Sequence, residues 1–225
     1  MASEPVQGQA RAWEAVAERW ARLVRRDTPH DDNLEAFLEL LPPPGRALLD
    51  LGCGEGRLSR RLSPLGYRVV GIDASPTLVR LAREADPVGD YRVADASVLP
   101  LDDASFDLVV AFMSLQDMDD SHGAVREAAR VLESGGRLCI SIIHPLWSAA
   151  EVDESGGRLT IRRYLATIPH VRPVMRVPSV HRPLEAYFGA LEAVGLLVEA
   201  LRELPAPDKL ASAVPVFLHL RAVKP

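Results

Sequence analysis

The chain has only two cysteines, Cys53 and Cys139, in 225 residues, which is too few for a disulfide framework. Both fall in segments whose patterns predict a core strand or a ligand-binding turn, so we expect reduced thiols. No run of 18 apolar residues is present, which argues against a membrane-spanning helix. The first residues also lack the apolar stretch of a signal peptide. We therefore expect a cytoplasmic protein that does not associate with a membrane.

Positive charge is not in excess either, because 26 Lys and Arg face 31 Asp and Glu and the net charge is −5. A nucleic-acid-binding protein usually has a basic face, so this balance disfavours DNA or RNA as a partner. The arginines at 19, 22, 25 and 26 share their stretch with Glu14 and Glu18, a pattern that indicates a solvated helix face. A small molecule is the expected partner, and the sequence leaves open whether the chain is a monomer or a homodimer.

The hydrophobic pattern changes character at Pro42-Pro43-Pro44. Before this triplet, apolar residues recur at helical spacing over 9–26 and 31–41. After it, short apolar runs alternate with helical patterns, which predicts an α/β protein with a doubly wound, mainly parallel seven-stranded sheet. The expected strands are 47–51, 67–72, 91–94, 107–112, 137–143, 196–203 and 215–222, the last two forming a hairpin. The expected helices are 57–65, one starting at Ser75-Pro76, one from Ser121 to Gly135-Gly136, and 184–195.

We expect a single domain over residues 1–225 with four parts. The N-terminal helices (1–44) form a lid, and residues 45–143 form the cofactor-binding core. Residues 144–183 are irregular and contain several prolines and histidines, which is typical of an insertion over a site. They form the expected substrate cap, and residues 184–225 supply the last helix and the strand hairpin.

The segment Leu48–Leu58 carries the strongest functional signal. An apolar run leads into Asp50, glycines follow at positions 52, 54 and 56, and a helical pattern begins at Arg57. Strand, glycine turn and helix is the arrangement expected to present backbone N–H groups and a positive helix end to a ligand. The Gly-x-Gly-x-Gly spacing differs from the Gly-x-Gly-x-x-Gly of dinucleotide folds, which disfavours a nicotinamide-dependent dehydrogenase.

Two further acids follow predicted strands, at the edge of the sheet where α/β proteins bind ligands. Asp73 is suited to accept two hydrogen bonds from a ribose diol, with a helix N-cap as the alternative role. Asp95 is suited to accept from an exocyclic amine such as adenine N6. Phe112 and Met113 end another strand and offer apolar surface to an adenine ring.

These motifs resemble those of the class I S-adenosylmethionine-dependent methyltransferases, in order and over about residues 45–143. The resemblance implies a Rossmann-like methyltransferase fold, S-adenosylmethionine as cofactor and S-adenosylhomocysteine as product. It also explains why Asp50 and Glu55 flank the turn, because acids disfavour a phosphate but suit an ammonium and a sulfonium. The matching segments are Leu48–Leu58, Val69–Ser75, Tyr91–Leu101, Phe106–Met113 and Arg130–Ile143.

The resemblance also implies roles for individual residues. The turn would lie along the methionine part of the cofactor, through Asp50, Gly52, Cys53 and Gly54, with Gly56 closing the turn. Asp73 would bind the ribose, and Ala74, Asp95 and Ala96 would lie at the adenine. Phe112, Met113 and Ser114 would line the approach to the methyl group. Trp13 or Trp20 would belong to the lid, with plain packing of helix on sheet as the alternative.

Candidates for the acceptor side come from the cap and from the end of the fourth strand. His144 and His181 are the predicted catalytic bases, and the alternative is a structural histidine in a proline-containing loop. Gln116, Tyr164 and Tyr187 are predicted to contact the substrate, as is Ser114, and His170 is a weaker candidate. No metal is predicted, because Asp117, Asp119 and Asp120 fit a solvated turn before the Ser121 cap better than a cation site.

We expect transfer of a methyl group to an oxygen or nitrogen nucleophile of a small molecule, with carbon as a further option. Residues 111–114, Ala-Phe-Met-Ser, lack the Asn/Asp-Pro-Pro-Tyr/Phe tetrad typical of enzymes that methylate nucleobase amines. The expected substrate is a quinone-like or natural-product metabolite. The alternative is a non-catalytic protein that binds S-adenosylmethionine as a sensor or partner subunit.

Overall fold

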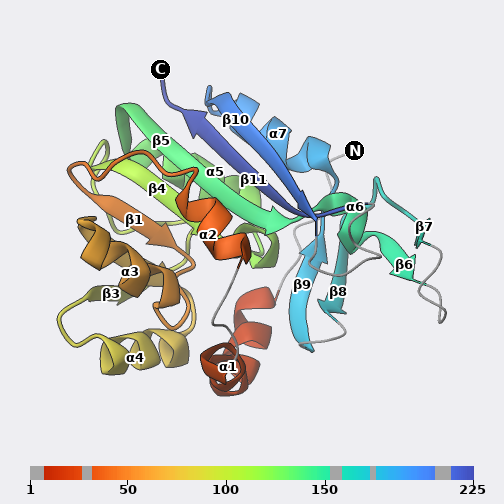
Figure 1. The fold of residues 1–225 in the computed structure, drawn as a ribbon, viewed down its shortest axis with the longest axis horizontal. Helices are drawn as coiled ribbons and strands as arrows, with labels where there is room; N and C mark the ends of the chain where they lie inside the picture. The colour runs from red at the N-terminus through yellow and green to blue at the C-terminus, as the bar shows by residue number, and fades with distance from the viewer. Residues whose placement is uncertain (1–7, 27–31, 153–158, 173–175, 206–213) are drawn as a thin grey trace.

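A seven-stranded sheet organises the molecule (Figure 1). The computed structural model describes residues 8–26, 32–152, 159–172, 176–205 and 214–225. The strand order is β10-β11-β5-β4-β1-β2-β3, in which β1 to β5 run parallel and β10 and β11 are antiparallel to their neighbours. The strands are β1 Leu48–Leu51, β2 Val69–Asp73, β3 Asp90–Val93, β4 Phe106–Phe112, β5 Leu132–Ile143, β10 Leu197–Pro205 and β11 Pro215–Val223. The predicted fold class and the terminal hairpin are confirmed.

Helices cover both faces of this sheet, because alternate residues of each central strand point to opposite sides. On one face, Leu49 and Ile140 belong to a core shared with α5 and α7. On the other, Leu48 and Val110 pack with residues of α2 and α3. The helices are α1 Gln9–Arg26, α2 Asp32–Leu38, α3 Arg57–Leu62, α4 Pro76–Ala85, α5 Ser121–Val131, α6 Pro145–Ser148 and α7 Leu184–Ala193, with short 3-10 turns η1 Ser63–Leu65 and η2 Leu115–Asp117.

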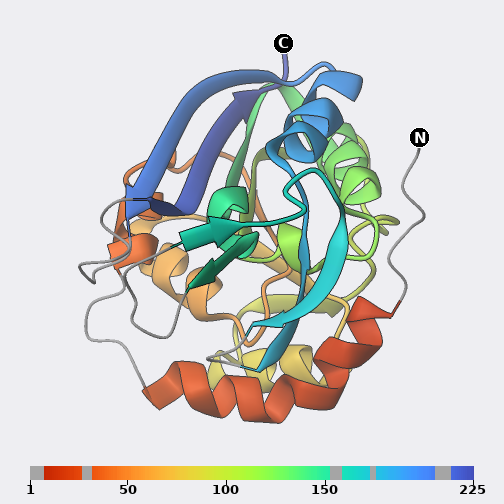
Figure 2. The same cartoon turned by 90° about the vertical axis from the view of Figure 1, so that its right-hand side faces the viewer.

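Two small hairpins follow β5, in the segment predicted to be irregular. The first pairs β6 Ala150–Val152 with β7 Leu159–Ile161, and the second pairs β8 Ile168–Arg172 with β9 Val177–His181. Figure 2 shows the β8–β9 hairpin descending toward α1, which lies along the lower edge of the molecule, away from the sheet. The described part of the predicted cap thus has regular structure of its own.

Helix α5 ends earlier than the sequence predicts. Gly135 and Gly136 do not close it, because α5 stops at Val131 and β5 starts at Leu132. The ammonium of Lys224 donates to the carbonyl oxygens of Ala129 (2.7 Å) and Leu132 (2.6 Å). A cation at a helix C-terminus satisfies the last carbonyl groups without a glycine. The sequence does not reveal this, since Lys224 lies more than 90 residues farther along the chain.

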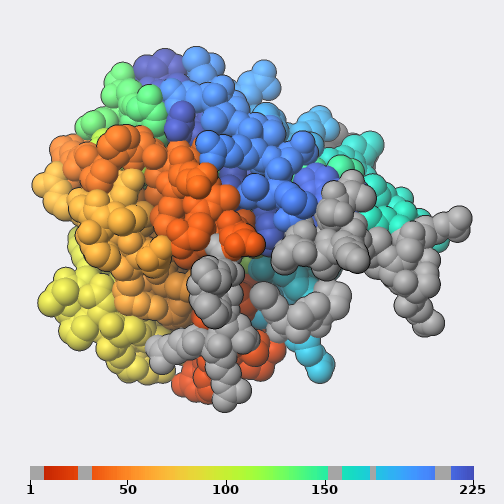
Figure 3. Space-filling view, viewed as in Figure 1, coloured from red at the N-terminus to blue at the C-terminus, as the bar shows by residue number. Residues whose placement is uncertain are grey.

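The surface next to the terminal hairpin joins distant parts of the chain. Figure 3 shows β10 beside the region of α2, where Arg202 Nη1 lies 3.8 Å from Glu39 Oε2.

Both cysteines are buried free thiols, as expected. Within the described ranges, no helix has the length and apolar character needed to cross a membrane.

Replacing Ile140 with alanine should lower the free energy of unfolding by about 2–5 kcal/mol, because a buried aliphatic side chain would leave a cavity. Ile140 is 1% exposed, whereas Val93 on the edge strand β3 is 47% exposed. Val93→Ala should therefore change stability by no more than about 0.5 kcal/mol. Urea unfolding followed by circular dichroism measures both, and equal losses would contradict this description of the core.

Candidate active site

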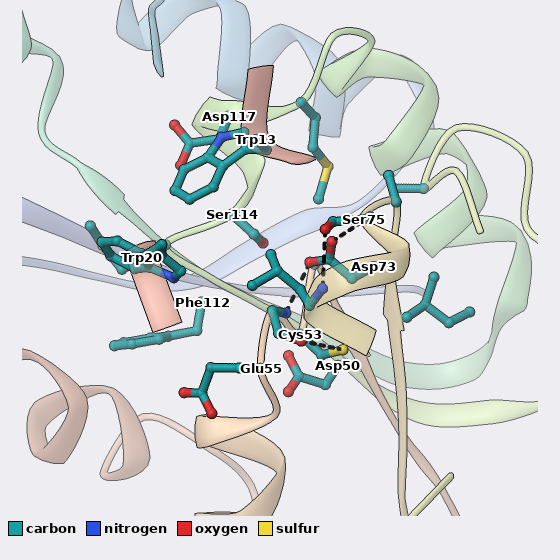
Figure 4. A pocket seen from close by; sticks show the side chains of 18 of the residues that line it. Trp13, Trp20, Asp50, Cys53, Glu55, Asp73, Ser75, Phe112, Ser114 and Asp117 are labelled. Atoms are coloured by element: carbon teal, nitrogen blue, oxygen red, sulfur yellow. Dashed lines mark hydrogen bonds between the residues drawn. The ribbon is translucent and has the colours of Figure 1, made fainter. Parts of the chain in front are cut away.

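A cavity of about 510 Å³ lies where β1, β2 and β4 end, and side chains of α1 form one of its walls (Figure 4). This is the edge at which parallel sheets bind ligands. Most of the predicted cofactor positions, and Ser114 of the predicted substrate positions, line the cavity. They are Asp50, Gly52, Cys53, Gly54, Asp73, Ala74, Asp95, Ala96, Phe112, Met113 and Ser114.

The glycine turn between β1 and α3 is held by its own N–H groups. Those of Gly52 and Cys53 donate to the carbonyl oxygen of Ile72 at 2.7 and 2.9 Å. The N–H of Gly54 donates to Asp73 Oδ2 at 2.9 Å. The expectation that this turn presents free N–H groups to a ligand is therefore wrong for these three positions. A phosphate would find no donor on them, in contrast to a dinucleotide fold.

Glycine is required in this turn for two different reasons. At Gly52, φ is +76° and an added Cβ would lie 2.5 Å from the Cβ of Ser114. At Gly54, φ is +57° but an added Cβ would meet no atom within 4 Å, so the backbone there borders open space. Gly56 does not line the cavity. It is the N-cap residue of α3, where its φ is +80°. At Gly54 the turn thus brings backbone without a side chain to the cavity, while Cys53 and Glu55 of the same turn also line it.

Asp73, the last residue of β2, fixes the turns on both sides of it. Its Oδ1 accepts from the Ser75 N–H at 2.9 Å, while Oδ2 holds Gly54. Burial raises the pKa of this carboxyl, and the two backbone donors oppose that shift. Asp73 is not the N-cap of α4, because Ser75 has that position and accepts from the Leu78 N–H at 3.1 Å. Each oxygen of Asp73 keeps a second lone pair for a ligand.

Asp50 is the most deeply buried acid of the cavity, at 1% exposure. Its Oδ2 accepts from the Ser59 hydroxyl at 2.6 Å. Burial raises the pKa of Asp50 to about 7. Glu55 differs, because Arg60 Nη2 lies 2.5 Å from its Oε2 and neutralises it. The electrostatic preference of the turn for a cation therefore depends on Asp50 and Asp73, and Glu55 adds less than the sequence predicts.

Asp95 and the end of β4 form two further walls. Both the N–H and the hydroxyl of Ser97 donate to Asp95 Oδ1 at 2.8 Å, which fixes the exposed carboxylate. Met113 has a φ of +56°, rare for a residue with a side chain. Ser114 follows and donates its hydroxyl to the carbonyl oxygen of Leu51 at 2.6 Å. The strand thus ends in a sharp turn that closes over the end of β1.

Helix α1 is fastened over the cavity by carboxylates at two points. Glu14 accepts from the hydroxyls of Ser75 and Thr77 at the start of α4, and these donors lower its pKa. Asp119 Oδ1 accepts from the N–H of Gln9, the first residue of α1, at 2.9 Å. Glu14 does not belong to a solvated helix face, which corrects the expectation from its neighbouring arginines. The fastening brings α1 over the ends of the strands.

The two tryptophans of α1 face the cavity rather than packing on the sheet (Figure 4). Their rings lie edge to face, with centroids 5.4 Å apart and planes at 84°. Phe112 lies opposite and contacts Phe37, with ring centroids 5.0 Å apart. Trp13, Trp20 and Phe112 therefore give one part of the cavity an aromatic lining.

Asp117 does not belong to a solvated turn, contrary to the expectation. Its Oδ1 accepts from the Ser179 hydroxyl at 2.7 Å, and its Oδ2 is paired with Arg172 of the β8–β9 hairpin. Asp120, not Ser121, is the N-cap of α5, accepting from the Gly123 N–H at 2.7 Å. Within the described ranges, no group of three or more His, Cys, Asp or Glu side chains is arranged to bind a metal.

Neither predicted catalytic histidine is among the described residues that line the cavity. His144 is 1% exposed; its Nδ1 accepts from the Leu146 N–H at 3.1 Å, and its Nε2 lies 2.9 Å from Glu203 Oε1. Burial lowers the pKa of His144. His181 Nε2 donates to the carbonyl oxygen of Tyr164 at 2.8 Å, so its Nδ1 accepts from the Ser148 hydroxyl at 2.7 Å. Both imidazoles have the structural role that was the alternative.

The remaining predicted substrate residues also lie away from the described cavity lining. Gln116 is buried, and its Nε2 donates to the carbonyl oxygen of Met113 at 2.7 Å. Tyr187 is buried on α7, where burial raises its pKa to about 12. Tyr164 supplies its carbonyl to His181, and burial lowers the pKa of His170 on β8. None of these four residues is among the described residues that line the cavity.

Asn33, Arg172 and Phe217 are among the cavity residues that were not predicted from the sequence. Asn33 Oδ1 accepts from His219 Nε2 at 2.8 Å, and burial lowers the pKa of His219 to about 4, so this imidazole is neutral. No local motif marks these positions, because they come from α2, β8 and β11. Only the arrangement of these three elements around the cavity identifies them.

Comparison with known proteins gives a consistent result. Residues 49–140 match the family described as a methyltransferase domain. The ubiquinone biosynthesis O-methyltransferase of Xanthomonas axonopodis pv. citri is 36% identical over 139 residues, 58% of this chain and 58% of that protein. The chain spans 33%, 58% and 48% of the length of three curated relatives that it matches.

Solved structures agree over a longer part of the chain. A crystal structure of an S-adenosylmethionine-dependent methyltransferase from Mesorhizobium loti is 29% identical, with a TM-score of 0.73 over 84% of this chain and 96% of that one. The [4+2]-cyclase SpnF is 20% identical, with a TM-score of 0.70 over 100% of this chain and 99% of that one. The second likeness concerns the fold alone.

The raised pKa of Asp50 predicts a pH dependence of stability in the unliganded protein. Between the ordinary pKa of an aspartate and about 7, the folded chain holds a proton that the unfolded chain has lost. This contribution to stability is complete below the unfolded pKa and is lost as the pH rises through the folded pKa. Asp50→Asn removes this loss, so its stability relative to the native chain should increase from about pH 5 to pH 8. Urea unfolding at several pH values measures this difference.

Asp95→Asn is the matched control, because Asp95 is an exposed carboxylate of the same cavity. It makes the same change from carboxylate to amide at an exposed position, so a pH dependence found only in Asp50→Asn belongs to the buried position. Parallel pH curves for Asp50→Asn and the native chain would contradict the assignment of a buried proton to Asp50.

Proposed function

Because the chain belongs to the class I S-adenosylmethionine-dependent methyltransferases, we propose that it methylates an oxygen, nitrogen or carbon nucleophile of a small molecule. The observation that carries this proposal is the cavity itself. It joins an acidic glycine turn, suited to a cationic cofactor, to an aromatic compartment beneath α1. The fold alone does not support a methyltransferase activity, because a [4+2]-cyclase has a similar fold.

The donors and acceptors of the cavity fit S-adenosylmethionine better than a dinucleotide. The N–H groups of Gly52, Cys53 and Gly54 are already bonded, whereas the carboxylates of Asp50 and Asp73 line the cavity. Negative charge there stabilises an ammonium and a sulfonium and repels a phosphate. In this proposal Asp50 binds the amino acid part of the cofactor, Asp73 the ribose, and Asp95 with Ala96 the adenine.

S-adenosylmethionine would supply an activated methyl group. The lone pair of the nucleophile would form the new bond to the methyl carbon as the carbon–sulfur bond breaks; the electron pair of that bond would stay on sulfur in S-adenosylhomocysteine, and an O–H or N–H nucleophile would lose its proton to solvent. The protein's part is to orient the nucleophile and to exclude water. Trp13, Trp20 and Phe112 surround the space in which the nucleophile would lie. We assign no base role to His144 or His181, because their ring nitrogens bind other protein groups.

The substrate in this proposal is a quinone-like or natural-product metabolite, enclosed by the N-terminal lid and by the 144–183 cap. Two observations support it: the likeness to a ubiquinone biosynthesis O-methyltransferase, and the aromatic lining of the cavity. Incubation with S-adenosylmethionine and a panel of phenols, hydroquinones and amines, followed by assay of S-adenosylhomocysteine release, tests the activity. Tight S-adenosylhomocysteine binding without turnover on the whole panel would favour the alternative, a non-catalytic sensor or partner subunit.

Asp73→Ala should weaken S-adenosylhomocysteine binding by about 1.5–3 kcal/mol, the contribution of charge-assisted hydrogen bonds to the ribose. Calorimetric titration measures this loss. Asp73→Asn keeps one carbonyl acceptor, so its loss of binding free energy should be smaller than that of Asp73→Ala. This second variant tests whether the loss comes from the missing acceptor for the ribose or from disorder of the turn. Asp90→Ala is the control, because Asp90 lies at the opposite end of the sheet, paired with Arg92. Unchanged affinity in Asp73→Ala would overturn the ribose assignment.

A further inference from the structure

A pair of hydrogen-bond donors lies in the cavity wall that α1 and the β8–β9 hairpin build together. They are Nε of Arg172 and Nε1 of Trp13, and we call them the Arg172–Trp13 donor pair. Both residues line the cavity, and the Arg172 guanidinium carbon lies 5.8 Å from the centroid of the Trp13 ring. Arg172 is 9% exposed. The two groups are therefore neighbours inside the protein, although 159 positions separate them in the sequence.

Both donor atoms are buried and have no hydrogen-bond acceptor among the described residues. A buried N–H group without an acceptor is costly, so most such groups in proteins are paired. Asp117 binds Nη2 of the Arg172 guanidinium. Both donors belong to residues that line the cavity, so an acceptor atom of a ligand there would satisfy them once the two side chains turn toward it.

The charge around the donor pair disfavours an anionic ligand. Asp117 already neutralises Arg172. Among the described residues, seven carboxylate side chains line the cavity against the guanidinium groups of Arg57 and Arg172. Two of the seven, Glu55 and Asp117, are paired with arginines, so five carboxylates remain against Arg57. A carboxylate or phosphate on the substrate would meet this negative field, whereas a neutral phenol or carbonyl oxygen accepts hydrogen bonds without that repulsion.

The shape of the neighbouring wall indicates what carries this oxygen. Trp20, Phe112 and Phe217 line the same cavity, and the rings of Trp13 and Trp20 stand nearly perpendicular. Aromatic walls favour a flat ring system through stacked and edge-to-face contacts.

On the basis of the proposed function, we propose that the Arg172–Trp13 donor pair selects the methyl-accepting substrate. It binds an uncharged oxygen atom of a flat aromatic molecule. Neither residue lies within residues 49–140, which match the methyltransferase family. Substrate selection by this pair therefore belongs to the segments that flank the family core, α1 on one side and β8 on the other.

Calorimetric titration of the S-adenosylhomocysteine complex with matched naphthalenes tests this proposal. The probes are 1-naphthol, with a neutral oxygen; 1-methylnaphthalene, of similar size without an oxygen; and 1-naphthoate, with an anionic group. The native complex should bind 1-naphthol about tenfold more tightly than 1-methylnaphthalene, the effect of one net hydrogen bond. It should also bind 1-naphthol more tightly than 1-naphthoate.

Trp13→Phe keeps the aromatic ring but removes its N–H, and Arg172→Lys keeps the charge beside Asp117 but removes the Nε donor. Each variant should reduce the preference for 1-naphthol over 1-methylnaphthalene by at least about threefold. Trp20→Phe is the matched control, because it changes the same aromatic wall, next to Trp13, without removing either donor atom. It should weaken both probes alike and leave their ratio unchanged.

The outcomes separate this inference from the proposed function. Failure of the native chain to bind S-adenosylhomocysteine would overturn the proposed function itself. Normal S-adenosylhomocysteine binding with an unchanged probe ratio in both variants would overturn only the role of the donor pair, as would failure of every naphthalene to bind the native complex. A loss of S-adenosylhomocysteine affinity in both variants, with the ratio unchanged, would assign the donors to the cofactor and also overturn the inference.

Discussion

The hydrogen bonds between the glycine turn and strand β2 are the constraint on which the site depends. Gly52 and Cys53 donate to Ile72, and Gly54 donates to Asp73. These bonds continue the parallel pairing of β1 with β2 beyond the last strand residue. They fix a turn that needs positive φ, and they leave carboxylates rather than free N–H groups at the cavity. The backbone hydrogen bonds that shape the turn therefore also favour a positively charged ligand.

Carboxylates also fasten the outer segments to the core. Glu14 joins α1 to the start of α4, and Asp119 binds the first N–H of α1. Asp117 joins the end of β4 to the β8–β9 hairpin through Arg172 and Ser179. Each acid is compensated by hydroxyl, N–H or guanidinium donors, which lets it lie in or near the cavity wall without a buried unpaired charge. The acidic character of the cavity thus holds the walls together as well as favouring a cation.

In this architecture, the family core and the segments that flank it contribute different parts of the cavity. The sheet and the turns after β1 to β4 form the part that matches the methyltransferase family, residues 49–140. The aromatic wall and the Arg172–Trp13 donor pair come largely from segments outside that match. A fold that binds one cofactor with its strand ends can therefore accept different substrates by changing the helices and hairpins that cover them.

The sequence by itself determined the order of strands and helices, the turn at Gly52–Gly56 and the acids at the strand ends. These features depend on spacing over a few residues, such as glycines at alternate positions and an aspartate directly after an apolar run. Tertiary structure decided which polar side chains outside the strand ends and their turns face the cavity. His144 and His181 follow the same local rules as catalytic histidines, yet packing turns them to Glu203 and Tyr164. No local sequence motif marks Arg172. It reaches the cavity because α1, β4 and β8 converge there. This convergence is set by packing between segments that are far apart in the chain.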